Sequence, residues 1–415
     1  MTLFADILSS VFERRVRFSG GWSKDDRSLA ELTTDLIGTG GEGSGLNIAN
    51  RILDTYQDLD IAGKMGFFLH LARDMNIDPD AVRQALAAYE DSPGKATYRA
   101  FMSAAEPASQ EVIRRLNRVP GGTEVLVRMR ADLLRLGKDH PDLQALDVNF
   151  RHLFVSWFNR GFLVLRPISW ESPAHILDKI IAYEAVHAIH SWDDLRRRLQ
   201  PEDRRCFAFF HPAMPDEPLI FVEVALAKGV PKSIDRLLAQ DRETLAQERA
   251  DTAVFYSISN CQPGLAGISF GNSLIKQVAR DLAAELPQIR SFVTLSPIPG
   301  LVDWLDETGI SADAADPESM RKLAAQYLLH AKRPDGLPRD PVARFHLGNG
   351  ALVHAVHAKA DASEKGRAQS GGTMVNYLYD LARLSENHEG FIARQPVPAS
   401  SEVRTLANSK TRPAG

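Results

Sequence analysis

Apolar residues recur at three- and four-residue spacing through most of the first 158 residues, with Arg, Glu and Asp between them. Such spacing puts the apolar side chains on one face of an α-helix, as a helical bundle requires. No run of alternating β-branched residues, which would indicate a strand, occurs before Phe150. We therefore predict an all-helical bundle domain over residues 1–158, with its clearest helices at residues 46–59, 65–75, 80–89 and 111–136.

Two local signals predict where helices begin. Ser28 and Glu31 fit a capping box, in which each side chain bonds a backbone N–H at the start of a helix. Ser172 precedes Pro173, and serine at the N-cap followed by proline at the first helical position is a common start. We expect a helix to begin at each of these places.

The pattern changes near Trp157, where short apolar runs start to alternate with helical segments. Short apolar runs bounded by turn residues are typical of strands. Strands that follow one another directly, and then a strand–loop–helix–strand unit, indicate a mixed sheet with helices on its faces. The chain is thus predicted to be α+β, with strands at residues 161–166, 206–210, 219–226, 252–258 and 291–295 and a helix at residues 272–286.

Length and composition agree with a division into domains. A chain of 415 residues is too long for one ordinary core. Its 44% of hydrophobic and 25% of charged residues are typical of a globular protein. We expect the second domain at residues 159–394, and the proline, serine and small residues of 395–415 predict a loosely held C-terminal tail.

Charge and cysteine content narrow the classes of partner. The 49 basic and 53 acidic residues give a net charge of −4, which does not favour a nucleic-acid partner. Two cysteines, Cys206 and Cys261, are too few for a disulfide framework or a four-thiolate metal site, which indicates a reducing compartment. The first six residues lack the basic start of a secretory signal, and no run approaches the roughly 18 apolar residues that span a bilayer. We expect a cytoplasmic protein with no membrane partner.

A glycine-containing loop precedes the helix expected at residue 272. Gly264, Gly267 and Gly271 would let backbone N–H groups approach an anion, and the helix that follows would point its positive end at the same place. A pyrophosphate would fit there. The spacing matches neither a dinucleotide fingerprint nor a P-loop, so the pattern alone also allows a turn that binds no ligand.

Ser296 and His346 are the side chains most suited to catalysis. Each is expected at the end of an apolar strand and before turn residues, where a rigid element presents a side chain to a substrate. Ser296 is not in a nucleophile elbow, and a serine before proline is often only a turn residue. His346 could equally be a histidine of the core. His354 and His357 lack the spacing of a metal pair, and we expect no metal site.

Several segments, taken together and in order, resemble the malonyl-CoA decarboxylase family. The resemblance covers about residues 150 to 384, and the helical first part is compatible with it. The segments that carry it are Glu217–Leu219, Phe255–Ser259, Gly264–Asn272, Leu295–Gly300, Phe345–Ala351 and Asn376–Tyr377.

The resemblance implies a fold, a reaction and an assembly. It implies a helical domain that often serves oligomerisation, hence a homo-oligomer (dimer or tetramer), followed by a catalytic domain of the GNAT acyl-CoA fold. The family converts malonyl-CoA to acetyl-CoA and CO2 and uses neither a metal nor an organic cofactor. Fatty acid metabolism is the expected setting.

The resemblance also implies site residues. Ser296 and His346 match the catalytic pair, and Ser257 matches a serine near the acyl end of the substrate. One position departs from the family, since eukaryotic members have an acid where this chain has Ser269. The CoA-binding loop corresponds to Ala266, Gly267, Ile268, Ser269, Phe270, Gly271 and Asn272.

On this basis we expect Ser296 to orient the substrate by hydrogen bonding. His346, as an imidazolium or through water, would protonate the carbon that loses CO2. Two alternatives stay open from the sequence. One is a GNAT-type acyltransferase that moves an acyl group from CoA to an amine, and the other is a non-catalytic acyl-CoA-binding protein.

Overall fold

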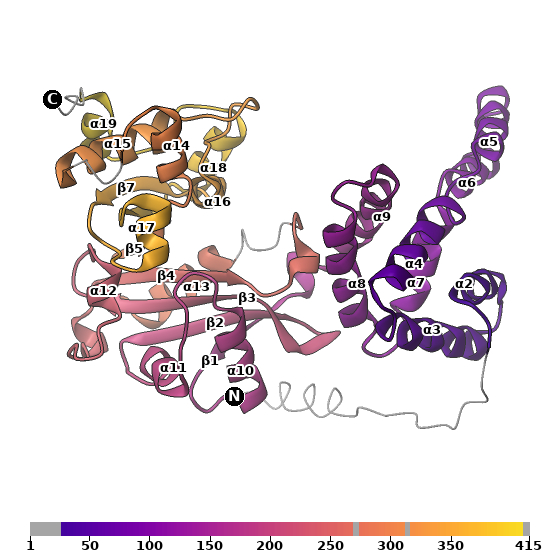
Figure 1. The fold of residues 1–415 in the computed structure, drawn as a ribbon, viewed down its shortest axis with the longest axis horizontal. Coiled ribbons are helices and arrows are strands. Elements are labelled where there is room, and N and C mark those ends of the chain that lie inside the picture. Colours follow the sequence, from indigo (N-terminus) through magenta and orange to yellow (C-terminus); the bar gives the residue numbers. More distant parts are fainter. Residues whose placement is uncertain (1–25, 269–273, 312–315, 410–415) are drawn as a thin grey trace. The chain divides into compact units, whose positions relative to one another are not determined.

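The computed structural model describes residues 26–268, 274–311 and 316–409, and it divides into two compact units (Figure 1). The first consists of Met1–Leu163, His211–Glu217 and Gln262–Ser269, and the second of Val164–Phe210, Pro218–Cys261 and Phe270–Gly415. Helices fill the first unit and a mixed sheet with helices forms the second, which confirms the α+β class. The limits predicted at residues 158 and 394 stay predictions.

The first unit is built from amphipathic helices, as the spacing predicts. Ser28 accepts a hydrogen bond from Glu31 N–H at the start of α2, and the Glu31 carboxylate bonds Ser28 N–H in return, which confirms the capping box. The helices are α2 (Leu29–Gly38), α3 (Glu42–Gln57), α4 (Ile61–Arg73), α5 (Pro79–Asp91), α6 (Lys95–Ala104), α7 (Ala108–Leu116), α8 (Gly122–Leu136) and α9 (Pro141–Trp157), with the 3₁₀ turns η1 (Arg160–Phe162) and η3 (Pro263–Leu265).

The helix predicted over residues 111–136 is in fact two helices. α7 ends at Leu116 and α8 begins at Gly122. Between them Pro120 has no N–H to donate, and Gly121 has φ of 79°, a left-handed conformation that most residues avoid. The prediction was wrong here because the apolar spacing continues across the break.

The second unit contains an eight-stranded mixed sheet, with the order β1-β2-β3-β4-β5-β8-β6 and β7 paired to β8. β4 pairs with β5 in parallel, whereas β8 is antiparallel to β5, β6 and β7. The strands are β1 (Val164–Ile168), β2 (Arg204–His211), β3 (Met214–Ala227), β4 (Thr252–Asn260), β5 (Ser291–Thr294), β6 (Ser296–Pro297), β7 (Leu352–His357) and β8 (Met374–Leu378).

Helices of the second unit pack against this sheet. Apolar residues of α10 and α11 form a buried cluster with β1, β2 and β3, and Ile234 of α12 belongs to a second cluster with β4 and β5. The helical segments are α10 (Ala174–Tyr183), α11 (Trp192–Leu199), α12 (Ile234–Leu237), η2 (Gln247–Arg249), α13 (Leu274–Glu285), α14 (Leu301–Glu307), α15 (Pro317–His330), α16 (Pro341–Gly348), α17 (Glu364–Ser370), α18 (Leu384–Ile392) and α19 (Ser401–Asn408).

The start predicted for α10 was wrong by one residue, because Pro173 is the N-cap and the Ser172 hydroxyl accepts a hydrogen bond from Ser169 N–H instead.

The C-terminal segment also differs from the expected loose tail. Within residues 395–415, α19 packs on α15 and β7 and buries Val403, Leu406 and Ala407.

The pairing of β4 with β5 ends just before Ser296, the candidate catalytic serine. The last registered pair is Phe255 with Thr294, after which Leu295 N–H still donates to Phe255 C=O. Ser296 then pairs with β8 instead of β4.

The expectation that His346 ends a strand was wrong. His346 lies on α16, because Asp340 caps that helix through Ala343 N–H and Pro341 occupies its first turn. The helix stops before Gly350, which has φ of 83°. A short apolar run bounded by turn residues fits a helix as well as a strand, and here the cap decides.

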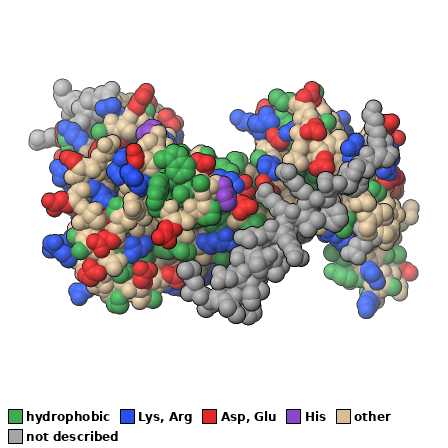
Figure 2. Space-filling model, turned by 90° about the horizontal axis from the view of Figure 1, so that it is seen from below, with side chains coloured by type: hydrophobic (Ala, Val, Ile, Leu, Met, Phe, Trp, Pro, Cys, Tyr) green, Lys and Arg blue, Asp and Glu red, His purple; other side chains and the backbone are tan. Residues whose placement is uncertain are grey.

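Acidic and basic side chains are interspersed over the face shown in Figure 2, in line with the small net charge. Among the residues that the structure describes, no helix combines the length and the hydrophobicity that a bilayer crossing requires.

Candidate active site

Ser296 and His346 meet in the second unit although 50 residues separate them in sequence. Ser296 Oγ lies 3.1 Å from His346 Nε2, and both side chains are buried. Ser296 Oγ also donates to Thr294 Oγ1 at 2.9 Å. A hydroxyl has one proton to donate, so Ser296 must accept from His346, which places the imidazole proton on Nε2.

The other ring nitrogen has a partner that the sequence analysis missed. His346 Nδ1 lies 2.8 Å from the Tyr379 hydroxyl, and since Nε2 carries the proton, the phenol donates to Nδ1. Tyr379 follows β8, and its own N–H donates to Phe292 C=O of β5. The result is a buried chain of hydrogen bonds from Tyr379 through His346 and Ser296 to Thr294.

Burial controls the protonation of the side chains in this series of hydrogen bonds. Desolvation lowers the pKa of His346 to about 3 and raises the pKa of Tyr379 well above its usual range. The imidazole ring also stacks on Tyr377, with ring centroids 4.5 Å apart. Both groups are therefore neutral near pH 7, and each holds a proton that can be donated.

Ser257, the serine expected near the acyl end, is bound to a carboxylate that the sequence analysis did not single out. Ser257 Oγ lies 2.8 and 2.7 Å from the two carboxylate oxygens of Glu184, the residue that follows α10. Val186 N–H and His187 N–H also donate to Glu184 Oε1. The carboxylate thus ties the segment after α10 to β4 through Ser257.

A second carboxyl group lies on the strand next to Ser257. Glu223 of β3 pairs with Ser257 of β4 and is fully buried. Desolvation, with the charge of Glu184 as a further cause, raises the pKa of Glu223 to about 8, although Arg198 lies 3.3 Å from it. Ser257 therefore lies in a strongly polar and buried environment.

The expected CoA-binding loop is described only in part. Ala266 and Gly267 form an exposed turn after η3, and Ile268 is buried. Gly267 has φ of 75°, which favours glycine there. These three residues belong to the first unit. Ser269, Phe270, Gly271 and Asn272 lie outside the described residues.

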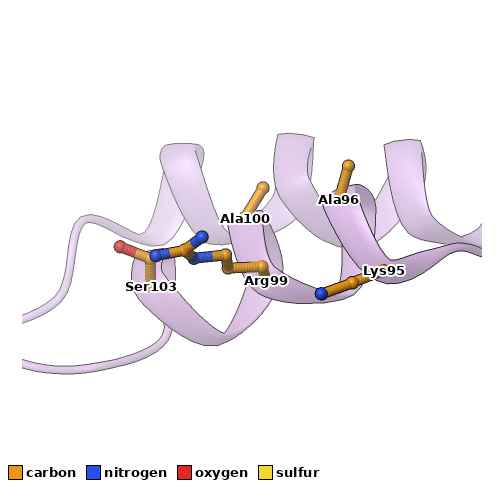
Figure 3. A pocket seen from close by; sticks show the side chains of 5 residues that line it. All are labelled: Lys95, Ala96, Arg99, Ala100 and Ser103. Carbon is orange, nitrogen blue, oxygen red and sulfur yellow. The ribbon is translucent and has the colours of Figure 1, made fainter.

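An open hollow occurs elsewhere, on the surface of α6 (Figure 3). Its lining residues are Lys95, Ala96, Arg99, Ala100 and Ser103, and α6 has no buried residue. None of these residues belongs to the candidate active site or to the expected CoA-binding loop. Lys95 and Arg99 are solvated cations one helical turn apart, and such a pair does not by itself define a binding site. Within the described ranges, no group of three or more His, Cys, Asp or Glu side chains is arranged to hold a metal ion.

Two family models match the chain. The model described as malonyl-CoA decarboxylase C-terminal domain matches residues 161–318 and 312–414, and the one described as malonyl-CoA decarboxylase N-terminal domain matches residues 75–158. Among curated relatives, the mitochondrial malonyl-CoA decarboxylase of Anser anser anser is 33% identical over 352 residues, which cover 73% of this chain and 70% of the relative. The mitochondrial enzyme of Mus musculus is 33% identical over 351 residues, covering 72% and 71%.

Solved structures are similar as well. The crystal structure of malonyl-CoA decarboxylase from Rhodopseudomonas palustris has a TM-score of 0.85 and 46% identity, and the match covers 91% of this chain and 98% of that one. The crystal structure of the Agrobacterium vitis enzyme has a TM-score of 0.86 and 45% identity, with coverage of 92% and 100%.

We predict that His346 stays uncharged down to about pH 4.5, because burial holds its pKa near 3, below the 6.5 of an exposed histidine. The measurement is a pH titration of the imidazole NMR signals in protein labelled at histidine. His346→Asn assigns the signal by its loss. A midpoint near 6.5 for this signal would contradict the buried, neutral state.

Proposed function

The chain belongs to the malonyl-CoA decarboxylase family, and from that premise we propose that it converts malonyl-CoA to acetyl-CoA and CO2 with Ser296 and His346 at the reacting end of the substrate. The observation that carries the proposal is the 3.1 Å contact between Ser296 Oγ and His346 Nε2. A neutral acid and an orienting hydroxyl are what this reaction requires of its site.

The reaction needs stabilisation of one anion and delivery of one proton. When CO2 leaves, the electron pair of the broken C–C bond forms an enolate whose charge lies largely on the thioester oxygen. Donors placed toward such an oxyanion contribute about 3 kcal/mol each. Ser296 exchanges its hydrogen bond to Thr294 for one to the substrate, and this bond holds the carboxylate or the thioester in one orientation.

His346 protonates the enolate carbon from Nε2, and Tyr379 supports the transfer. Of the two routes expected from the sequence, burial disfavours the imidazolium route because it keeps the ring neutral. As the Nε2 proton moves to carbon, directly or through water, Nδ1 takes the proton of the Tyr379 hydroxyl, 2.8 Å away. The imidazole is neutral before and after the step, and solvent returns a proton to the phenolate.

Two further elements complete the proposal. Ser257, held by Glu184, contacts the acyl end of the substrate. The exposed turn at Ala266 and Gly267, which is followed by the buried Ile268, receives the CoA moiety through backbone N–H groups. Ser269, Phe270, Gly271 and Asn272 extend this loop in the proposal.

The assembly and the compartment are further proposals. We propose a homo-oligomer, either a dimer or a tetramer, that works in the cytoplasm in fatty acid metabolism. The curated relatives named above are mitochondrial, so fractionation of the source cells is the measurement for the compartment. Light scattering of the purified protein measures the oligomer.

We predict that His346→Asn lowers kcat for CO2 release from malonyl-CoA by two or more orders of magnitude, because a positioned proton donor contributes about 10²–10⁴-fold. CoA binding, measured by calorimetry, should remain. The wild-type protein with malonyl-CoA alone is the reference, since an acyltransferase would release no CO2 without an acceptor. Full activity of His346→Asn would remove His346 from the mechanism.

We predict that no acyl group becomes attached to Ser296 during turnover. The proposed role is hydrogen bonding, so an acid-quenched reaction should show an unmodified protein mass. Ser296→Ala should lower kcat/KM by about 10- to 100-fold, in keeping with the loss of a hydrogen bond to a charged group. An acyl adduct on the wild-type peptide that contains Ser296, absent from Ser296→Ala, would show covalent catalysis instead.

We predict that Glu184→Gln lowers kcat/KM for malonyl-CoA by about tenfold. A neutral amide has one acceptor oxygen and cannot satisfy Ser257 together with the two backbone N–H groups that Glu184 Oε1 now accepts. Glu389→Gln, at an exposed position, is the control and should leave kcat/KM unchanged. Equal kinetics for the two variants would show that Glu184 does not position Ser257.

A further inference from the structure

Arg130 of α8 is a buried arginine that the proposed chemistry does not use. Its side chain is 2% exposed. Nε donates to Asp147 Oδ1 at 2.7 Å and one terminal nitrogen to Asp147 Oδ2 at 3.2 Å. The other terminal nitrogen donates to the backbone carbonyls of Gly264 and Ala266, at 2.7 and 2.9 Å. A helix of the bundle thus holds the loop after β4.

The loop also lies directly on the backbone of α8. A Cβ atom added to Gly264 would lie only 1.8 Å from Val127 C=O, so no side chain fits at this position. Leu265 is buried, whereas Ala266 and Gly267 are exposed. The same short segment is therefore fixed on its inner side by Arg130 and open on its outer side.

The contacts require an arginine. Its planar guanidinium carries five N–H donors in a fixed arrangement, so it can bind one carboxylate and two carbonyls at the same time. Asp147 compensates the charge that the burial of Arg130 would otherwise leave unpaired. A lysine offers a single ammonium on a flexible stem and cannot reproduce both sets of contacts.

We propose that Arg130 is a positioning residue for the acyl-CoA substrate: it fixes the backbone of the turn at Ala266 and Gly267 in the geometry that receives the CoA moiety. The inference rests on the proposed function of this loop. It gives the helical unit a part in substrate affinity besides any part in assembly. Loss of the hydrogen bonds from Arg130 to this loop should weaken the binding of CoA thioesters. It should leave the chemical step nearly unchanged, because that step depends on Ser296 and His346.

The same bundle offers a matched control in Arg115 of α7. Arg115 Nε donates to Glu111 at 2.7 Å, and a terminal nitrogen donates to the carbonyls of Leu36 and of Thr39, the latter at 2.9 Å. It therefore combines the same elements, an arginine, one carboxylate and two backbone carbonyls. Its contacts lie within residues 36–115 of the first unit and do not involve residues 262–268.

The experiment compares Arg130→Lys with Arg115→Lys in the full-length protein, well below the temperature at which either unfolds. Steady-state assays give KM and kcat for malonyl-CoA, and calorimetry gives Kd for CoA itself. For Arg130→Lys we expect KM and Kd to rise about tenfold, with kcat within about twofold of wild type. For Arg115→Lys we expect a lower Tm with unchanged KM and Kd.

Unchanged KM and Kd in Arg130→Lys, or an equal rise in both variants, would overturn the positioning role. Gly264→Ala serves as a second variant if Arg130→Lys does not fold. It displaces the loop while Arg130 is retained, so KM and Kd should rise as well. The two proposals fail separately: a wild-type protein that binds CoA but releases no CO2 refutes the decarboxylase, while the Kd comparison still decides the role of Arg130.

Discussion

The parting of two parallel strands is the constraint on which the candidate site depends. β4 and β5 pair through Phe255 and Thr294, and the chain then turns to β8 at Ser296. This turn places the Ser296 hydroxyl among side chains from three different segments rather than in a continuous ladder. Thr294, His346 and Tyr379 then complete a chain of hydrogen bonds in which every member is buried.

Burial decides the chemistry of that chain as much as position does. In water an imidazole exchanges protons near neutral pH, but the low polarity around His346 keeps it neutral. A neutral imidazole bonded to a phenol can pass on a proton while the ring itself stays neutral, because the phenol replaces the proton that the ring donates. This suits a reaction whose intermediate is a strong base and whose substrate already carries a negative carboxylate.

The sequence predicts those features that local interactions determine. The spacing of apolar residues predicts that the first unit is helical, although it misses the break between α7 and α8. The Ser28–Glu31 capping box is observed where it is predicted. The residues that flank Ser296 and His346, together with the family resemblance, predict that these two side chains form the site. The structure brings these two together, while their catalytic roles remain a proposal.

Features that depend on distant residues escaped prediction. The secondary structure around His346 is set by the Asp340 cap, a signal present in the sequence but outweighed by the apolar run beside it. Glu184, Tyr379 and Arg130 carry no local signal, because each acts on a residue 33 to 134 positions away. Only the fold shows that such side chains are neighbours.

The first unit is made of three separate chain segments, and this affects how chimeras with related proteins can be designed. Residues 211–217 and 262–269 group with the helices although they are encoded within the sheet region. A chimera joined near residue 163 would therefore pair α8 of one parent with a loop shaped for the other. Exchanging these two short segments along with the helices keeps Gly264 against the α8 backbone that it contacts.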